Sequence, residues 1–317
     1  MKKIERVNCV LKGVEPDHPP MGFWLHFPKD INSKGVEAQV AAHLDFKDKT
    51  QTDILKIMNE NEMRNNHKIE HLHEWKNIPK LSKDSKLVTD QADILHRIVE
   101  GNGGDCYLLG TVHGLVASLS HASGHSYSVS PALINDHYNR DPSAVIEGLK
   151  IIEENTQHVL EMTMGSGVQG IYYAALGGEK NKFSDNFIHQ ALKPTECTLL
   201  KQAEENDAIS TFLHICKEET VLENYQDYPC DVVNWAMHES DYSLDEGHRI
   251  FGNKVYLGGF DDRSGVLVDG NKQEIQKKLN KIQQEFSGNR YIIGADCTLP
   301  TDIPLAKLRH IHDCLRQ

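Results

Sequence analysis

The sequence lacks the features that place a protein in a membrane or on nucleic acid. No apolar run approaches the roughly 18–20 residues that a membrane-spanning helix requires. Lysine and arginine number 34 against 46 aspartates and glutamates, so the formal net charge is −12, and they form no basic block. Because phosphate contacts require clustered basic residues, we expect neither nucleic acid nor a membrane as a partner.

The sequence also has little that suggests secretion. The N-terminal stretch MKKIERVNCVLKG carries charges without a continuous apolar segment, so we expect no signal peptide. The seven cysteines are odd in number and scattered over 317 residues, which does not indicate a disulfide framework. We therefore expect a cytoplasmic protein with free thiols, some of them metal ligands. The oligomeric state cannot be read from these features.

Short apolar segments alternate with helical patterns along most of the chain. The expected strands are residues 21–27, 53–58, 106–110, 168–175, 209–216, 230–237, 254–260 and 290–295. A helix over residues 2–12 precedes them, and no repeat or linker interrupts the series. Eight strands separated mostly by helices predict a single-domain α/β protein over residues 1–317. Its expected fold is a (β/α)8 TIM barrel with an N-terminal helical extension.

Two of the expected strands end in residues that bind metals. TFLHIC places His214 and Cys216 two residues apart, so in a strand both side chains point to the same face. The run YIIGADC ends in Cys297 in the same way. In a TIM barrel the C-terminal strand ends carry the active site, and one histidine with two thiolates leaves a zinc ion one open position. We predict a catalytic zinc site at His214, Cys216 and Cys297.

Other residues near expected strand ends are weaker candidates. Glu60 could act as an acid or a transient ligand, but a solvated loop explains it equally well, and the role of His238 is open. A helix surface or the packed core offers a simpler interpretation for several of the pocket candidates. The residues predicted to line a substrate pocket are Trp24, His26, His113, Tyr172 and Asp261.

Several motifs together resemble the uroporphyrinogen decarboxylase superfamily, specifically its methylcobamide:coenzyme M methyltransferase branch. They are KKIERVNCVLKGVEPDHPPMGFW at the N-terminus, CYLLGTVHGLVASL, FLHIC, and GADCTLPTDIPLAKLRHI near the C-terminus. The family's zinc ligands correspond to His214, Cys216 and Cys297. Two departures stand out. Lys217 follows Cys216 where the family usually has glycine, and GFWLHFPKD replaces the arginine-rich stretch of true uroporphyrinogen decarboxylases.

The resemblance implies a zinc-dependent methyltransferase. In that reading, zinc activates a small thiol as a thiolate, and a methylcorrinoid on a partner corrinoid protein is the methyl donor or acceptor. Two alternatives stay open: a decarboxylase or lyase acting on a small acid, and a non-catalytic metal-binding subunit of a methyl-transfer system. The sequence names neither the thiol nor the direction of transfer.

Overall fold

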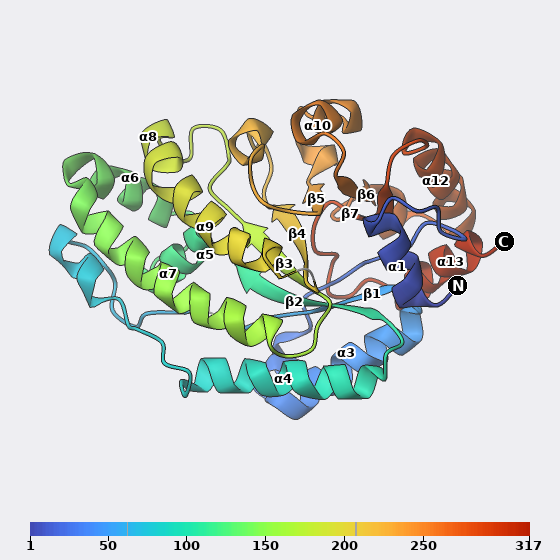
Figure 1. The fold of residues 1–317 in the computed structure, drawn as a ribbon, viewed down its shortest axis with the longest axis horizontal. Helices are drawn as coiled ribbons and strands as arrows, with labels where there is room; N and C mark the ends of the chain where they lie inside the picture. The colour runs from blue at the N-terminus through green and yellow to red at the C-terminus, as the bar shows by residue number, and fades with distance from the viewer. Residues whose placement is uncertain (62, 207) are drawn as a thin grey trace.

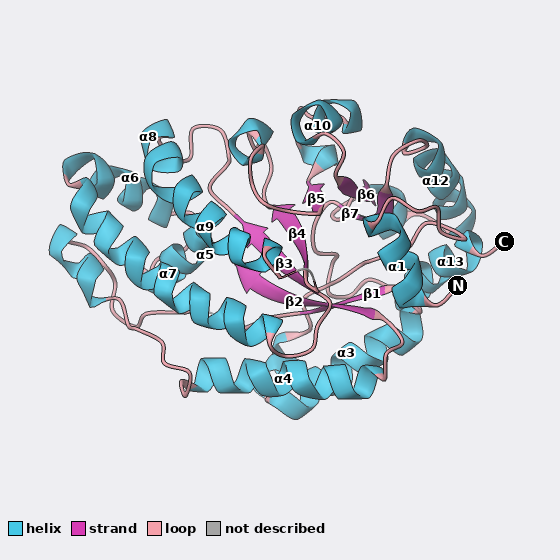
Figure 2. Cartoon of the chain, in the orientation of Figure 1, coloured by secondary structure: helices cyan, strands magenta, loops and turns pink. Residues whose placement is uncertain are grey.

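The computed structural model describes residues 1–61, 63–206 and 208–317. In these residues the chain forms one parallel sheet of seven strands in sequential order, surrounded by helices (Figures 1 and 2). The strands are β1 (Ile54–Ile57), β2 (Tyr107–His113), β3 (Gly170–Ala175), β4 (Ser210–Ile215), β5 (Val232–Trp235), β6 (Val255–Phe260) and β7 (Tyr291–Ala295). The fold is therefore α/β and TIM-barrel-like, as the alternating pattern predicts.

Three helices precede β1, and the others lie between or after the strands. The longer ones are α1 (Lys3–Leu11), α3 (Val36–Thr50), α4 (Lys86–Asn102), α5 (Leu115–Ala122), α6 (Ser130–Arg140), α7 (Pro142–Met164), α9 (Lys193–Glu204), α10 (Leu244–Phe251), α12 (Lys272–Glu285) and α13 (Leu305–Leu315). The shorter ones are α2 (Lys29–Ser33), η1 (Leu72–Asn77), α8 (Asp185–Phe187), η2 (Ile188–Leu192), η3 (Leu222–Tyr225), η4 (Met237–Glu239) and α11 (Gly265–Asp269). Within the described residues, no helix has the length and apolar character needed to cross a membrane.

The expected first strand, residues 21–27, is not a regular strand. Met21 forms an isolated parallel bridge with Ile293 of β7, and Gly22 forms one with Ile54 of β1. The segment thus lies between the two edge strands without a continuous ladder. Two backbone bonds join it to β7: the Ile293 N–H donates to the Pro20 carbonyl, and the Gly22 N–H donates to the Ile293 carbonyl. This pairing is too short for a regular strand. The prediction of eight regular strands was wrong at this position.

Alternation along the strands separates two apolar regions. On β1, Ile54 belongs to a cluster inside the curved sheet, whereas Leu55 and Ile57 belong to the core beneath the helices. Val7 and Val10 of α1 join the inner cluster, and α1 contacts β1, β2 and β7. The N-terminal helix therefore covers the inner cluster at the N-terminal ends of the strands and leaves the C-terminal ends free for a site.

A buried histidine holds the C-terminal end of β1 to α3. The Nδ1–H of His43 donates to the carbonyl of Gln39 at 2.7 Å, and the backbone N–H of Met58 donates to His43 Nε2 at 2.9 Å. Only a neutral imidazole can donate and accept in this way. Burial lowers the pKa of His43 from its ordinary 6.5 to about 4.

This pKa predicts a loss of stability at mildly acidic pH. The folded pKa lies below the unfolded one, so the stabilisation by neutral His43 is complete above pH 6.5 and is lost as the pH falls toward 4. When the pH falls from 7 to 5, protonation linked to His43 should lower the free energy of unfolding by about 2 kcal/mol. Urea titrations of the wild type and of His43→Gln at both pH values test this. Equal pH dependence in the two proteins would contradict it.

Candidate metal centre

The three predicted metal ligands converge at the C-terminal end of the sheet. His214 lies in β4, Cys216 follows the end of that strand, and Cys297 lies two residues beyond β7. One ligand atom from each residue lies within 4.8 Å of the other two, and Cys297 Sγ is 3.3 Å from His214 Nε2. Among the described residues this is the group of histidine, cysteine and acidic side chains that could hold a metal ion.

The side chain of Asn234 determines which nitrogen of His214 is available. Asn234 is buried in β5, and its Nδ2 donates to the carbonyls of Leu257 and Ala295 at 2.9 and 3.1 Å. Its Oδ1 therefore faces His214 Nδ1 at 2.6 Å and accepts a hydrogen bond from the Nδ1–H group. The lone pair of His214 is thereby placed on Nε2, beside Cys297. A ligating histidine whose other nitrogen is held in this way is typical of metal sites.

The two thiols are electrostatically coupled. A hydrogen bond from Cys216 holds the pKa of Cys297 well below its ordinary value. The same bond and burial raise the pKa of Cys216 well above its ordinary value. With His214, this half-buried pair, which already favours one thiolate, provides a donor set of one imidazole and two sulfurs, which suits zinc. The residues present thus fit the metal that the sequence predicts.

Aromatic rings and a lysine lie below this group, inside the sheet. The Tyr172 ring stacks on His214, with centroids 5.3 Å apart and planes at 21°, and Trp24 meets Tyr172 edge-on at 4.9 Å. Lys56 Nζ lies 4.2 Å from the Tyr172 ring centroid. Tyr172 and Trp24 are almost fully buried.

The ligands open into a cavity of about 520 Å³. Its wall includes the three ligand side chains together with residues from β1, β2, β3 and the loops after β4, β6 and β7. Predicted pocket residues among the lining are His26, His113 and Tyr172, whereas Trp24 lies in the apolar cluster behind it. Asp262 and Arg263, which the end of the expected strand 254–260 also places near the pocket, line the cavity as well. Lys56 and Thr111 line it too, and sequence reasoning did not assign them.

Glu60 lies close to this cavity and pairs with a pocket residue. Its Oε1 is 2.8 Å from His26 Nδ1. Burial raises the pKa of Glu60, but His26, Lys56 and His113 outweigh that effect, so the pKa lies below its ordinary value. Glu60 is therefore a carboxylate at neutral pH. It can accept a proton only transiently.

Asp261 and His238 do not line this cavity. Asp261 accepts hydrogen bonds from the backbone N–H groups of Arg263 and Ser264 and from Ser264 Oγ, so it stabilises its own loop. The neighbouring Asp262 lines the cavity instead, and burial raises its pKa to about 7. His238 donates through its backbone N–H to the buried Asp296 and lies in the wall of a separate cavity of about 600 Å³.

Lys217 has an unusual backbone conformation beside Cys216. Its φ is +85°, in the left-handed region that favours glycine. A left-handed backbone here agrees with the glycine that the resemblance implies at this position. In this chain a lysine occupies the left-handed position, and its side chain lines the metal cavity.

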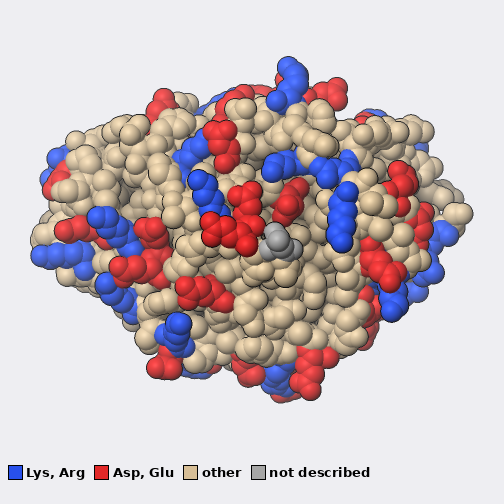
Figure 3. Space-filling view, in the orientation of Figure 1, with Lys and Arg blue, Asp and Glu red and all other residues tan. Residues whose placement is uncertain are grey.

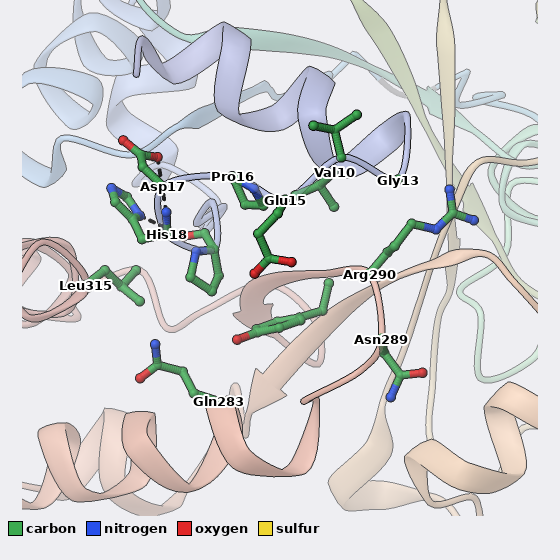
Figure 4. Close-up of a pocket in the computed structure, with 13 residues that line it drawn as sticks. Val10, Gly13, Glu15, Pro16, Asp17, His18, Gln283, Asn289, Arg290 and Leu315 are labelled. Atoms are coloured by element: carbon green, nitrogen blue, oxygen red, sulfur yellow. Dashed lines mark hydrogen bonds between the residues drawn. The ribbon is translucent and has the colours of Figure 1, made fainter.

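Another cavity, of about 370 Å³, lies at the opposite end of the sheet beside the first residue of β7. Figure 4 shows Glu15, Asp17 and His18 around it, together with Gln283 of α12. Among the described residues, the side chains around this cavity form no group that could hold a metal ion. The surface view in Figure 3 shows acidic and basic side chains interspersed over one face of the molecule.

A family model for uroporphyrinogen decarboxylase (URO-D) matches residues 55–317. The chain belongs to this family. Among solved structures, a methyltransferase from Methanosarcina mazei is similar with a TM-score of 0.76 and 14% identity, covering 99% of this chain and 98% of the other. A B12-independent methionine synthase from Shewanella sp. W3-18-1 has a TM-score of 0.57 and 13% identity, covering 94% and 92%. No curated protein sequence matches the chain. At these identities the structural likeness shows a shared fold.

The hydrogen bond between Asn234 and His214 predicts a loss of metal affinity on substitution. Asn234→Ala removes the acceptor for His214 Nδ1, so zinc affinity should fall by about 10–100-fold. Competition with a chromophoric chelator measures the affinity. Asn155→Ala is the matched control, because Asn155 is a buried asparagine that bonds Leu81 and Pro79 away from the ligands. Equal zinc affinities of the two variants would contradict the assignment.

Proposed function

We propose that the protein is a zinc-dependent methyltransferase. It transfers a methyl group between a corrinoid protein and a small thiol, with His214, Cys216 and Cys297 holding the metal. The observation that carries the proposal is the convergence of these three ligand atoms within 4.8 Å at the wall of a cavity. Three protein ligands beside an open space are typical of catalytic zinc sites.

When bound there, zinc would keep a substrate thiol deprotonated near neutral pH, which makes its sulfur a nucleophile. The protein's own residues orient the site. Asn234 holds His214 in the tautomer with Nε2 free, and the Tyr172 ring fixes the imidazole plane. The apolar cluster below Tyr172 excludes water from the inner side of the ligands. Substrate therefore reaches the sulfurs only from the cavity.

The cavity wall offers polar groups for the substrate. His26, His113 and Asp262 line it, and Glu60 bonds His26 at its edge. His26 and His113 contact the substrate in this proposal. Glu60 either accepts a proton transiently or acts as a transient ligand of the metal. We assign no catalytic role to His238, because it faces a different cavity.

The family and the fold support this activity at a coarser level. The chain belongs to the URO-D family, and the similar structure from M. mazei is described as a methyltransferase. We further infer that residues 21–25 complete the seven strands to an eight-membered barrel and that residues 1–317 form one domain. The seven cysteines, all within the described residues, form no disulfide, which fits a cytoplasmic protein.

A second candidate is a decarboxylase or lyase acting on a small acid. The observation that favours it is the presence of three basic side chains in the cavity wall, Lys56, Lys217 and Arg263, which could bind carboxylates. Zinc content separates the two candidates, because only the methyltransferase depends on the ion. Activity with free methylcobalamin separates the methyltransferase from a non-catalytic metal-binding subunit.

Substitution of a ligand tests the proposal directly. Cys297→Ser should lower the zinc content from about one ion per chain to a small fraction and slow the thiol-dependent demethylation of methylcobalamin by more than ~100-fold. Cys314→Ser is the matched control, because Cys314 lies in α13 outside the ligand group. Metal analysis and the absorbance of the corrinoid measure both effects. Unchanged zinc content in Cys297→Ser would refute the metal site.

A further inference from the structure

Lys56 is a charged side chain in the apolar interior of the sheet. It is 5% exposed and lies on β1 between Ile54 and Met58, which both belong to the inner cluster. Its ammonium lies 4.2 Å from the Tyr172 ring centroid and 5.5 Å from that of Trp24, and it donates to Met58 Sδ at 3.3 Å. Among the residues that the structure describes, no carboxylate lies within ion-pair distance of it.

An ammonium in this position costs free energy that aromatic contacts only partly offset. Burial lowers the pKa of Lys56 to about 8, so at pH 7 most of the side chain is still charged. A lysine that served only to fill space could be replaced by methionine or leucine at lower cost. A charged lysine here is therefore favoured only if a negative charge lies nearby.

The metal-ligand cysteines are negative groups that can balance the charge of Lys56. Tyr172, Trp24 and Met58 are neutral. Among the described residues, the negative groups that act on Lys56 are Cys297, Glu60 and Cys216. Glu60 also bonds His26 at 2.8 Å, whereas both sulfurs line the same cavity as the ammonium. The charge of Lys56 thus acts on the two sulfurs and on whatever ligand occupies the open side of the site.

Formal charges show which ligand this arrangement favours. A divalent ion with two thiolates and a neutral imidazole carries no net charge, because +2 and −2 cancel. Water or a neutral thiol leaves that sum at zero, whereas a thiolate makes it −1. A fixed positive charge nearby stabilises the −1 state over the neutral one, and the effect is large in a cavity of low dielectric constant.

We propose that Lys56 is a positioning residue that makes the metal site select an anionic sulfur ligand, at the expense of weaker metal binding. This inference rests on the proposed function. Lys56 strengthens the binding of a thiolate and weakens the binding of the metal ion, and both effects have one physical cause. Metal binding cancels the negative charge of the sulfurs that attracts Lys56, and thiolate binding restores a negative charge beside it.

The experiment uses Lys56→Met, which removes the charge and keeps an unbranched side chain for the Tyr172 ring. Lys56→Arg keeps the charge. Lys49→Met is the matched control, because Lys49 is an exposed lysine of α3 that pairs with Asp45. Zinc affinity is measured by chelator competition. Thiol binding is measured with 2-mercaptoethanol, which has no acid group, through the visible absorbance of the cobalt(II)-substituted protein.

Lys56→Met should bind zinc more tightly and 2-mercaptoethanol more weakly, each by roughly tenfold. Lys56→Arg should restore thiol binding, and Lys49→Met should resemble the wild type. Unchanged thiol affinity in Lys56→Met, or a parallel loss of both affinities, would overturn the inference. If Lys56→Met does not fold, Lys56→Gln takes its place, with the same expected opposite shifts.

The failure of this inference and that of the proposed function are distinguishable. A wild-type protein that binds no metal would overturn both. A wild-type protein that binds metal and thiol, with the same affinities in Lys56→Met, would overturn the role of Lys56 alone and leave the proposed function standing.

Discussion

The amide of Asn234 connects the elements that must meet for a metal site to exist. Its Oδ1 accepts from His214 of β4, and its Nδ2 donates to Leu257 of β6 and to Ala295 of β7, the residue two positions before Cys297. One buried side chain thus sets the tautomer of one ligand and the position of the strand that delivers another. Because all of its hydrogen-bonding groups are used, any displacement would leave a buried polar group unsatisfied, which costs about 1–3 kcal/mol.

The electrostatics of the site depend on which residues of the barrel-like sheet and its loops carry charged side chains. The inner face is apolar from α1 up to Tyr172, and Lys56 is a buried positive charge in that region. Lys217 and Arg263 line the same cavity as Lys56 and the two sulfurs. The cavity wall that holds the sulfurs therefore carries three basic side chains. Such a cavity suits chemistry in which sulfur carries the negative charge, as the transfer of a methyl group to a thiolate requires.

Much of the fold and the site could be predicted from the sequence, for identifiable reasons. Seven of the expected strands correspond to observed ones because their apolar runs are short and bounded by polar turns. Residues 21–27 are not a regular strand, since the segment forms only isolated bridges at Met21, Gly22 and Leu25 and no continuous ladder. Lys56 and Asn234 were overlooked because a single polar residue in a strand looks like a solvent-facing one until the face is known. Asp261 and Asp262 differ by one position, and only the turn after β6 decides which one faces the cavity.

The sequence by itself determined the α/β class and the kinds of ligand, since apolar periodicity and residue chemistry are local properties. It also predicted that His214 and Cys216 share a side, because alternate residues of an extended segment point the same way, although the strand itself ends at Ile215. Only the tertiary structure decided that Cys297 reaches them, that His238 turns to Asp296, and that Lys56 lines the same cavity as the sulfurs. Those distances join segments far apart in the chain, and they depend on strand register and on the packing of the inner cluster, which no local pattern encodes.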